Sequence, residues 1–244
     1  MNERVLCWFS CGAASAYATK LATEKYGVRC EILYCDTLKY EHPDNVRFMA
    51  DCEKWFEKKI TLIRSDKYTD IFDVFDKTGW LVGPAGARCT TELKKKVRRA
   101  YQRDGDIHVF GYTVEEKHRV EQLAMGEPDL LCEFPLVESG LTKQNCLEAL
   151  FRADIEIPAM YRMGYSNNNC IGCVKGGAGY FNRIKRDFPE HFNRMAKQER
   201  KMNVAINKTY INGIRTPVFL DELPQDMGRG EAEPDIECGV LCLS

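Results

Sequence analysis

The chain has 244 residues, of which 44% are hydrophobic, and this suits one α/β domain with a long tail or a small appendage. Lys and Arg together number 35 and Asp and Glu 36, so the net charge is −1 and no overall field draws the protein to nucleic acid or to a membrane surface. No apolar run reaches membrane-spanning length, and the N-terminal sequence MNERVLCWF lacks the pattern of a secretory signal, so we expect a cytoplasmic protein.

The stretch over residues 5–26 contains the most informative pattern. An apolar run predicts a buried strand, which stops at the small-residue loop SCGAAS of residues 10–15 and turns into a helix beginning near Ser15. Backbone N–H groups and the positive end of the helix dipole make such a loop an anion site for phosphate or sulfate. The two common glycine-rich phosphate loops are absent, and an ordinary strand-to-helix turn is the alternative interpretation.

A second strand is expected over residues 30–37, and it ends in Asp36 and Thr37. In an open parallel sheet, polar residues at the carboxyl end of a strand face the ligand crevice. The next segments are predicted to be a helix over 45–58, a strand over 60–64, a partly helical stretch over 68–80 and a loop over 79–86.

The basic segment over residues 92–103 predicts a helix, followed by a strand over 107–112. Most of the helix cations are expected on a solvated face, while one or two near its start, such as Lys94, reach an anionic ligand. Strands that alternate with helices predict a Rossmann-like α/β fold, a mostly parallel sheet with helices on both faces.

In the C-terminal half the segments resemble helices and loops, without further strands. We expect a nucleotide-binding α/β core over 1–136, a helical part over 137–216 and an extended tail over 217–244, together forming one compact domain. The helical part contains a helix over 141–151, a loop over 160–179 and an amphipathic helix over 180–203 that is interrupted near 188–189.

The sequence Cys170-Ile171-Gly172-Cys173 is a strong local sign of metal or cluster ligation, because two thiolates at this spacing can hold one centre. The twelve cysteines of a protein in a reducing compartment favour ligands, a catalytic thiol and packing over disulfides. A thioredoxin-type redox pair is disfavoured because that motif follows a strand and opens a helix. Cys89, Cys238 and Cys242 are the candidates for further ligands.

Several segments in the same order resemble the phosphoadenosine phosphosulfate (PAPS) reductase family of the adenine nucleotide α-hydrolase-like superfamily. They are SCGAAS at 10–15, CDTLKYEHPDNVRF at 35–48, ARCTTELKK at 87–95, GYTVEEKHR at 111–119, MYRMGYSNNNCIGC at 160–173 and the tail sequence IECG at 236–239. The resemblance implies an adenine nucleotide at the carboxyl ends of the strands of a HUP-type sheet.

The resemblance also implies roles for particular residues. The phosphate or sulfate would be bound by Ser10, Gly12 and Ser15, the nucleoside would lie near Asp36 and Thr37, and anionic groups would pair with Lys94 and Arg119. The Cys238 thiolate would attack the sulfuryl sulfur of PAPS or adenosine phosphosulfate (APS), and a thioredoxin-like reductant would then release sulfite. Cys89, Cys170 and Cys173 would hold a [4Fe–4S] cluster. The implied protein is an oxidoreductase acting on a sulfur group, either alone or as a homodimer, without a membrane partner.

Departures from the family pattern leave two alternatives. Ala14 stands where magnesium-dependent ATP pyrophosphatases have Asp, Thr90 follows Cys89 in place of a second Cys, and the tail ends without His. The first alternative is an ATP-dependent sulfur-transfer or tRNA-thiolation enzyme with an iron–sulfur cluster, which would also bind nucleic acid. The second is a non-catalytic nucleotide- or nucleic-acid-binding module in which Cys170, Cys173, Cys238 and Cys242 hold zinc.

Overall fold

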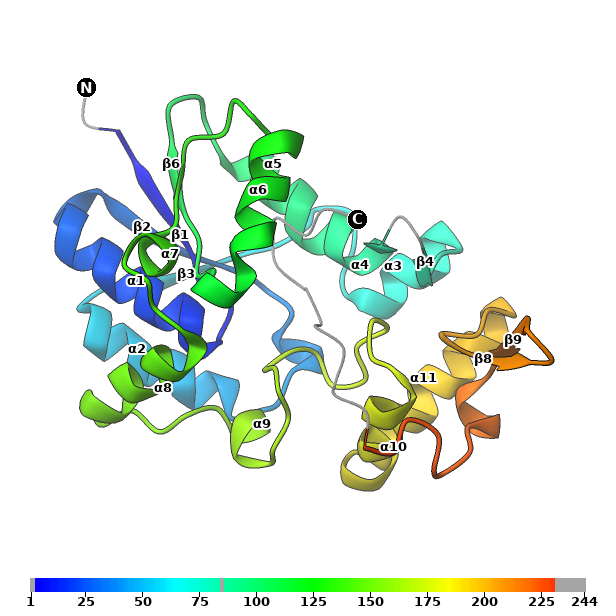
Figure 1. Cartoon of the computed structure of the whole chain (residues 1–244). Coiled ribbons are helices and arrows are strands. Elements are labelled where there is room, and N and C mark those ends of the chain that lie inside the picture. Colours follow the sequence, from blue (N-terminus) through cyan, green and yellow to red (C-terminus); the bar gives the residue numbers. More distant parts are fainter. Residues whose placement is uncertain (1–2, 84–85, 231–244) are drawn as a thin grey trace.

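A parallel five-stranded sheet forms the N-terminal half of the protein (Figure 1). The computed structural model describes residues 3–83 and 86–230. The strand order is β3-β2-β1-β6-β7, and every neighbouring pair is parallel. The strands are β1 (Val5–Trp8), β2 (Cys30–Cys35), β3 (Ile60–Ile63), β6 (Ile107–Val109) and β7 (Cys132–Glu133). The predicted α/β, Rossmann-like class is therefore confirmed.

Helices cover both faces of this sheet because successive side chains of a strand point to opposite sides. Val5, Cys7 and Phe9 belong to one hydrophobic cluster, while Leu6 and Trp8 belong to another. The first face packs on α1 (Ala13–Tyr26), α2 (Asn45–Phe56) and α8 (Lys143–Arg152), and the second on α5 (Lys96–Tyr101) and α6 (Lys117–Gly126). This two-sided burial explains why β1 reads as a continuous apolar run.

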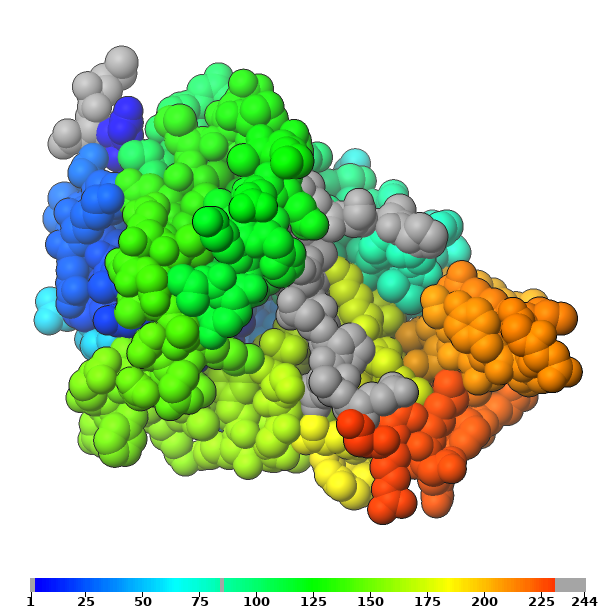
Figure 2. Space-filling view, in the orientation of Figure 1, coloured from blue at the N-terminus to red at the C-terminus, as the bar shows by residue number. Residues whose placement is uncertain are grey.

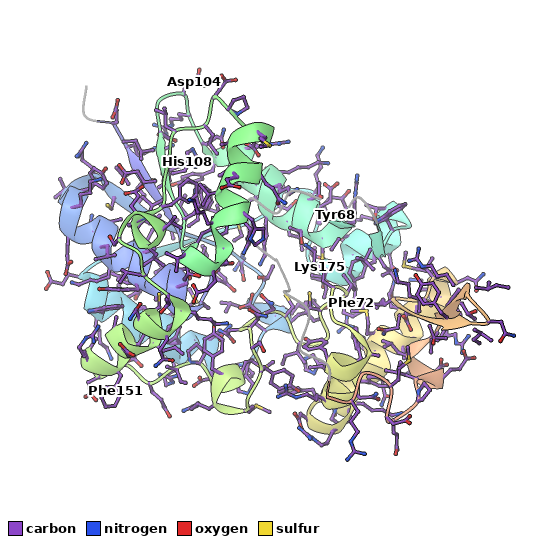
Figure 3. All side chains as sticks on the ribbon, viewed as in Figure 1. Tyr68, Phe72, Asp104, His108, Phe151 and Lys175 are labelled. Carbon is purple, nitrogen blue, oxygen red and sulfur yellow. The ribbon has the colours of Figure 1, made fainter. Side chains whose placement is uncertain are left out.

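One polar side chain lies inside the second cluster. His108 of β6 is 1% exposed and stacks between Trp8 and Phe110 (Figure 3). Its Nδ1 accepts a hydrogen bond of 2.9 Å from Trp8 Nε1. Burial lowers the pKa of His108 to about 4, so the ring stays neutral at physiological pH and acts as a hydrogen-bonded core residue.

A third hydrophobic cluster joins α3 (Ile71–Thr78) to the C-terminal helices α10 (Ala178–Asp187) and α11 (Pro189–Met202). Figure 3 places Phe72 and Lys175 in the region between the sheet and these helices. Cys170 and Cys173 belong to this cluster, and Cys89 packs against it. The predicted interruption near 188–189 is confirmed, because Pro189 opens α11 as its first residue.

The basic segment around residue 95 is helical, but the helix begins at Arg88 and not at the predicted residue 92. The helix begins with α4 (Arg88–Thr90), continues through a π-helical turn, η3 (Thr91–Lys95), and ends with α5, so Cys89 lies in its first turn. Arg98 is fully buried and donates to Glu127 at 2.5 Å, so this cation is not on a solvated face. Its partner lies 29 residues away in sequence.

A separate β-hairpin follows α11 and was not predicted. It consists of β8 (Asn207–Ile211) and β9 (Ile214–Val218), joined by Asn212 and Gly213, which both have positive φ values of 52° and 78°. Asn-Gly between two strands is the preferred sequence for this two-residue turn, so the signal was present in the chain. The hairpin projects from the far end of the molecule (Figures 1 and 2).

Several short elements complete the described part of the chain. They are η1 (Gly27–Arg29), η2 (Leu38–Tyr40), β4 (Val82–Gly83), β5 (Gly86–Ala87), η4 (Val114–Glu116), α7 (Pro135–Glu138), α9 (Ala159–Arg162) and η5 (Leu220–Glu222). Within residues 3–83 and 86–230, no helix has both the length and the apolar character needed to cross a membrane.

Candidate functional site

A pocket of about 390 Å³ lies at the carboxyl ends of β1, β2 and β6, beside the first turn of α1. This is the position at which open parallel sheets bind their ligands. Its lining comes from segments far apart in sequence: Trp8–Ser10, Gly12, Ala14, Ser15, Tyr34, Cys35, Glu41, Lys94, Phe110–Thr113, Glu115, Glu116, Arg119, Lys143, Tyr161 and Asn167–Asn169.

The loop after β1 has a compact shape fixed by its two serines. The Ser15 hydroxyl accepts hydrogen bonds from the Ser10 N–H and from the Ser10 hydroxyl, both at 3.1 Å, and donates to the Gly12 carbonyl at 3.0 Å. Gly12 is the N-cap of α1 and carries no capping side chain. The first turn of α1 therefore opens toward the pocket without a side-chain cap, which suits an anion.

Gly111 allows β6 to end directly against this helix turn. A Cβ at Gly111 would lie 2.5 Å from Ser15 Cα and 2.6 Å from Ser15 N, closer than any side chain tolerates. The backbones of the segment after β6 and of the start of α1 are thus in contact, and only glycine permits that approach.

Three cations and three carboxylates from the described residues line the pocket: Lys94, Arg119, Lys143, Glu41, Glu115 and Glu116. Arg119 forms an ion pair with Glu116 and lies over the Tyr112 ring at 4.2 Å from its centroid. Lys143 Nζ donates to the Ser166 carbonyl and lies 5.4 Å from the centroid of Tyr161. Arg119 and Lys143 are held in place by these neighbours, and all three cations line one cavity.

A buried hydrogen-bond network supports the floor of the pocket. Glu41 is 6% exposed, and its carboxylate accepts from the Tyr34 hydroxyl at 2.6 Å and the Thr37 hydroxyl at 2.6 Å. Asn45 Nδ2 donates to the same carboxylate at 2.7 Å. Three donors satisfy this buried charge, as such a group requires.

Asn168 extends this network to the loop over residues 10–15 that follows β1. Its Nδ2 donates to Asn45 Oδ1 at 2.8 Å and to the Cys11 carbonyl at 2.7 Å. Cys11 has a φ of 57°, a backbone conformation that is uncommon outside glycine and asparagine. A side chain from the C-terminal half thus fixes the strained residue of the loop.

The predicted nucleotide-binding residues divide into two groups. Ser10, Gly12, Ser15, Lys94 and Arg119 all line the pocket. Asp36 and Thr37 lie at the end of β2 but do not line it.

Asp36 pairs with Arg64 at 2.7 Å, and Thr37 acts indirectly through its hydrogen bond to Glu41. Their proposed proximity to the nucleoside stays a prediction.

The sequence did not identify Glu41, Lys143, Tyr161 or Asn168 as pocket residues. A weak local signal existed for Glu41, which stands four residues after Thr37 and four before Asn45. The other three belong to the C-terminal half, and no local pattern shows that this half returns to the carboxyl edge of the sheet. Burial raises the pKa of Tyr161 to about 12, so its hydroxyl stays protonated.

The CxxC loop directly continues one wall of the pocket. Asn167–Asn169 line the cavity, and the next residue is Cys170. The turn between the cysteines places Gly172 at a φ of 75°. The N–H groups of Gly172 and Cys173 donate to the Tyr180 hydroxyl at 3.0 and 3.2 Å.

The donor set suits a thiolate-bound centre in composition and neighbourhood. Cys170 and Cys173 are each 7% exposed, and Cys89 packs against the same cluster. Over residues 3–83 and 86–230, no group of three or more His, Cys, Asp or Glu side chains is arranged to hold a metal ion. Cys238 and Cys242 lie outside the described residues, as does the second half of the predicted tail, residues 231–244.

The fold and the pocket together define an α/β protein with a cavity at the carboxyl edge of a parallel sheet. No family model matches the chain, and no curated protein matches its sequence. Among solved structures, it is similar to the U34-tRNA thiolase NcsA from Methanococcus maripaludis with its [4Fe–4S] cluster. The two share 13% identity and a TM-score of 0.46, over 83% of this chain and 73% of the thiolase. A similarity at this level does not assign a function.

Proposed function

We propose that this protein is an enzyme of sulfur chemistry that binds an adenine nucleotide in the pocket at the sheet edge. One observation carries the proposal: the wall formed by Asn167–Asn169 joins the cavity directly to the CxxC loop. A volume of about 390 Å³ falls in the range of small-molecule sites. A nucleotide site and a pair of thiols would thus act on the same ligand.

The pocket residues supply the contacts that such a ligand needs. The loop of Ser10, Gly12 and Ser15 would bind a phosphate or sulfate through backbone N–H groups and hydroxyls. Arg119 and Lys143 would neutralise further anionic groups. The rings of Phe110 and Tyr112 line the same cavity and offer flat apolar surfaces for the purine.

The first candidate reaction is reduction of PAPS or APS. A thiolate at Cys238 attacks the sulfuryl sulfur, the bond from that sulfur to the bridging phosphate oxygen breaks, and adenosine phosphate leaves with the electron pair. The resulting S-sulfocysteine is attacked by a dithiol of a thioredoxin-like protein, which becomes a disulfide as sulfite is released. A soft thiolate is a good nucleophile for sulfur, and the pocket cations would stabilise the phosphate leaving group.

A [4Fe–4S] cluster would be held by Cys89, Cys170 and Cys173. When bound, it would supply a polarisable charge or an open iron position beside the nucleotide. We expect anaerobically purified protein to contain iron and acid-labile sulfide, and Cys170→Ala to lose both. Cys132→Ala is the matched control, since Cys132 packs in a different hydrophobic cluster from Cys170. Stoichiometric zinc in place of iron would contradict the cluster.

The second candidate is ATP-dependent sulfur transfer. Glu115 and Glu116 line the pocket beside the cations, and adjacent carboxylates favour a nucleotide that arrives with Mg²⁺. In this reaction an oxygen of the acceptor attacks the α-phosphorus of ATP and pyrophosphate leaves. A sulfide-level sulfur nucleophile from a separate donor then attacks the activated acceptor carbon, and AMP leaves with the oxygen. Ala14, where magnesium-dependent pyrophosphatases carry Asp, argues against this candidate.

Calorimetric titration with PAPS, APS and ATP, the last with and without Mg²⁺, tests the proposal and separates the candidates. A reductase binds PAPS or APS without metal and forms sulfite with thioredoxin, whereas a transfer enzyme binds ATP with Mg²⁺ and releases pyrophosphate. Arg119→Ala and Lys143→Ala should each weaken binding by roughly 10- to 100-fold, in keeping with the loss of a charged hydrogen bond. Arg103→Ala, an exposed cation outside the pocket, should leave binding unchanged. Failure of all three nucleotides to bind would overturn the proposal.

A further inference from the structure

The β8–β9 hairpin presents one fully exposed face. In its register Tyr210 pairs with Arg215 and Lys208 with Pro217, and all four residues are exposed. Residues two apart on one strand share a face, so Lys208 and Arg215 flank the Tyr210 ring along and across the ribbon. The opposite face contains buried Asn207 and half-buried Thr209 and is therefore turned toward the body of the protein.

The hairpin is positively charged in an otherwise balanced chain. Residues 203–219 contain Lys208 and Arg215 but no Asp or Glu, although the whole chain has 36 acidic residues. In the part of the chain that the structure describes, neither cation forms an ion pair. Tyr210 itself is 65% exposed, so its ring is accessible from solvent.

We propose that this face, formed by Lys208, Tyr210 and Arg215, binds single-stranded nucleic acid. A base would stack on the Tyr210 ring, and the two cations would pair with the phosphates on either side. Stacking requires an unpaired base, so a single strand fits the face better than a duplex. The inference goes beyond the proposed function and does not depend on it, because no hairpin residue lines the pocket and the hairpin lies away from the sheet (Figure 1).

A protein partner fits this face less well. The centres of protein interfaces are depleted in lysine, whereas Lys208 lies beside this ring on the same strand. The exposed aliphatic residues of the hairpin, Ile211 and Ile214, lie at its tip, and their register places them on the other face. A second copy of the chain docked through that tip is the competing explanation.

Fluorescence anisotropy with labelled 12-nucleotide RNA and DNA of mixed sequence tests the proposal over a series of salt concentrations. We expect the protein to bind, and the variant with both Lys208→Ala and Arg215→Ala to reduce the slope of log affinity against log salt by about 1.4, or ~0.7 for each lost phosphate contact. Tyr210→Ala should weaken binding roughly tenfold or more, and Tyr210→Phe should retain it.

A charge-matched control is the variant with both Lys67→Ala and Arg103→Ala, which removes two exposed cations outside the hairpin. It should bind like the unaltered protein. The proposal is overturned if the unaltered protein does not bind, if the control changes affinity as much as the hairpin variant, or if sedimentation shows a dimer that Ile211→Ser dissociates while nucleic-acid binding is absent. Titration of nucleotide into Tyr210→Ala monitors the pocket separately and should match the unaltered protein.

Discussion

The sheet-edge pocket and the β8–β9 hairpin are built in opposite ways. The pocket brings together side chains and backbone from both halves of the chain, and its tightest contact is between the backbones at Gly111 and Ser15. The hairpin is local in sequence, and one buried carboxylate ties its two ends to α11. Glu199 of that helix accepts from the N–H groups of Ile206, just before β8, and Leu220, just after β9. We therefore expect added side-chain volume to disrupt the pocket, and the loss of a single polar group to disrupt the hairpin.

The largest effect is expected at the tight backbone contact. Gly111→Ala would introduce a Cβ 2.5 Å from Ser15 Cα, so the end of β6 and the start of α1 must separate. We expect the free energy of unfolding to fall by about 3 kcal/mol, measured by urea denaturation. Nucleotide affinity should fall together with the stability, because the loop over residues 10–15 leads into α1. A variant as stable as the unaltered protein would show that the two segments do not pack this closely.

The second test concerns the buried Glu199 carboxylate that joins the two ends of the hairpin to α11. Glu199→Gln would place an amide NH₂ where an oxygen now accepts, leaving one buried N–H without an acceptor. At about pH 4.5, below the pKa of Glu199, we expect a loss of about 2 kcal/mol, and faster hydrogen exchange at the amides of Ile206 and Leu220. Glu190→Gln, on an exposed position of the same helix, is the control and should change stability by less than about 0.5 kcal/mol.

The same carboxylate gives a pH dependence of defined sign. Burial raises the pKa of Glu199 from 4.5 to about 6, because desolvation outweighs the two N–H donors. The folded protein therefore binds this proton more tightly than the unfolded chain, and the stabilisation is complete below about pH 4.5 and lost as the pH rises through about 6. Relative to Glu199→Gln, the unaltered protein should lose about 2 kcal/mol over this interval. A constant difference between the two proteins would contradict the raised pKa.

A smaller effect is expected where the C-terminal half meets the loop over residues 10–15. Asn168→Ala removes the hydrogen bonds to the Cys11 carbonyl and to Asn45, and should lower the unfolding free energy by about 1–2 kcal/mol. Asn167→Ala removes a neighbouring pocket residue outside this network and should change it by less than about 0.5 kcal/mol. Equal effects of the two substitutions would argue against the bridging role of Asn168.

The smallest effect is expected at the other glycine of the pocket. A Cβ at Gly12 would lie 3.3 Å from the Tyr161 hydroxyl, a contact that a small side-chain shift relieves. Gly12→Ala should therefore cost less than about 1 kcal/mol in stability. Combining it with Tyr161→Phe should restore the stability of Tyr161→Phe alone. A loss as large as that of Gly111→Ala would mean that both glycines are under the same constraint.

The same contrast explains how far the sequence could predict the structure. The parallel sheet and its helices followed from local apolar patterns, since strand and helix periods are properties of neighbouring residues. Five of the seven predicted nucleotide-binding residues line the pocket. Four of these five were found for a related reason, because they follow a predicted strand, open the helix after it or stand near the start of the basic helix.

Long-range partners were not predictable in this way. Lys143 and Asn168 line the pocket only because the C-terminal half folds back over the sheet, and the burial of Arg98 depends on Glu127 from another helix. The hairpin was missed for a different reason, because its Asn212-Gly213 signal lay in a stretch without other clear periodicity.

The π-helical turn over Thr91–Lys95 affects which changes in length this helix can accept during evolution. A π turn fits one residue more than an α turn into a single revolution, so deleting one residue there would restore ordinary helical winding while the segments on either side keep their relative orientation. Cys89, before the turn, packs against the hydrophobic cluster that contains Cys170, while Arg98, after the turn, is paired with Glu127. A deletion in the regular part of the helix would rotate one of these residues away from its partner by about 100°, whereas a deletion within the π turn would leave both in place. Descendants of this protein should therefore tolerate the loss of one residue within this turn more readily than elsewhere in the helix.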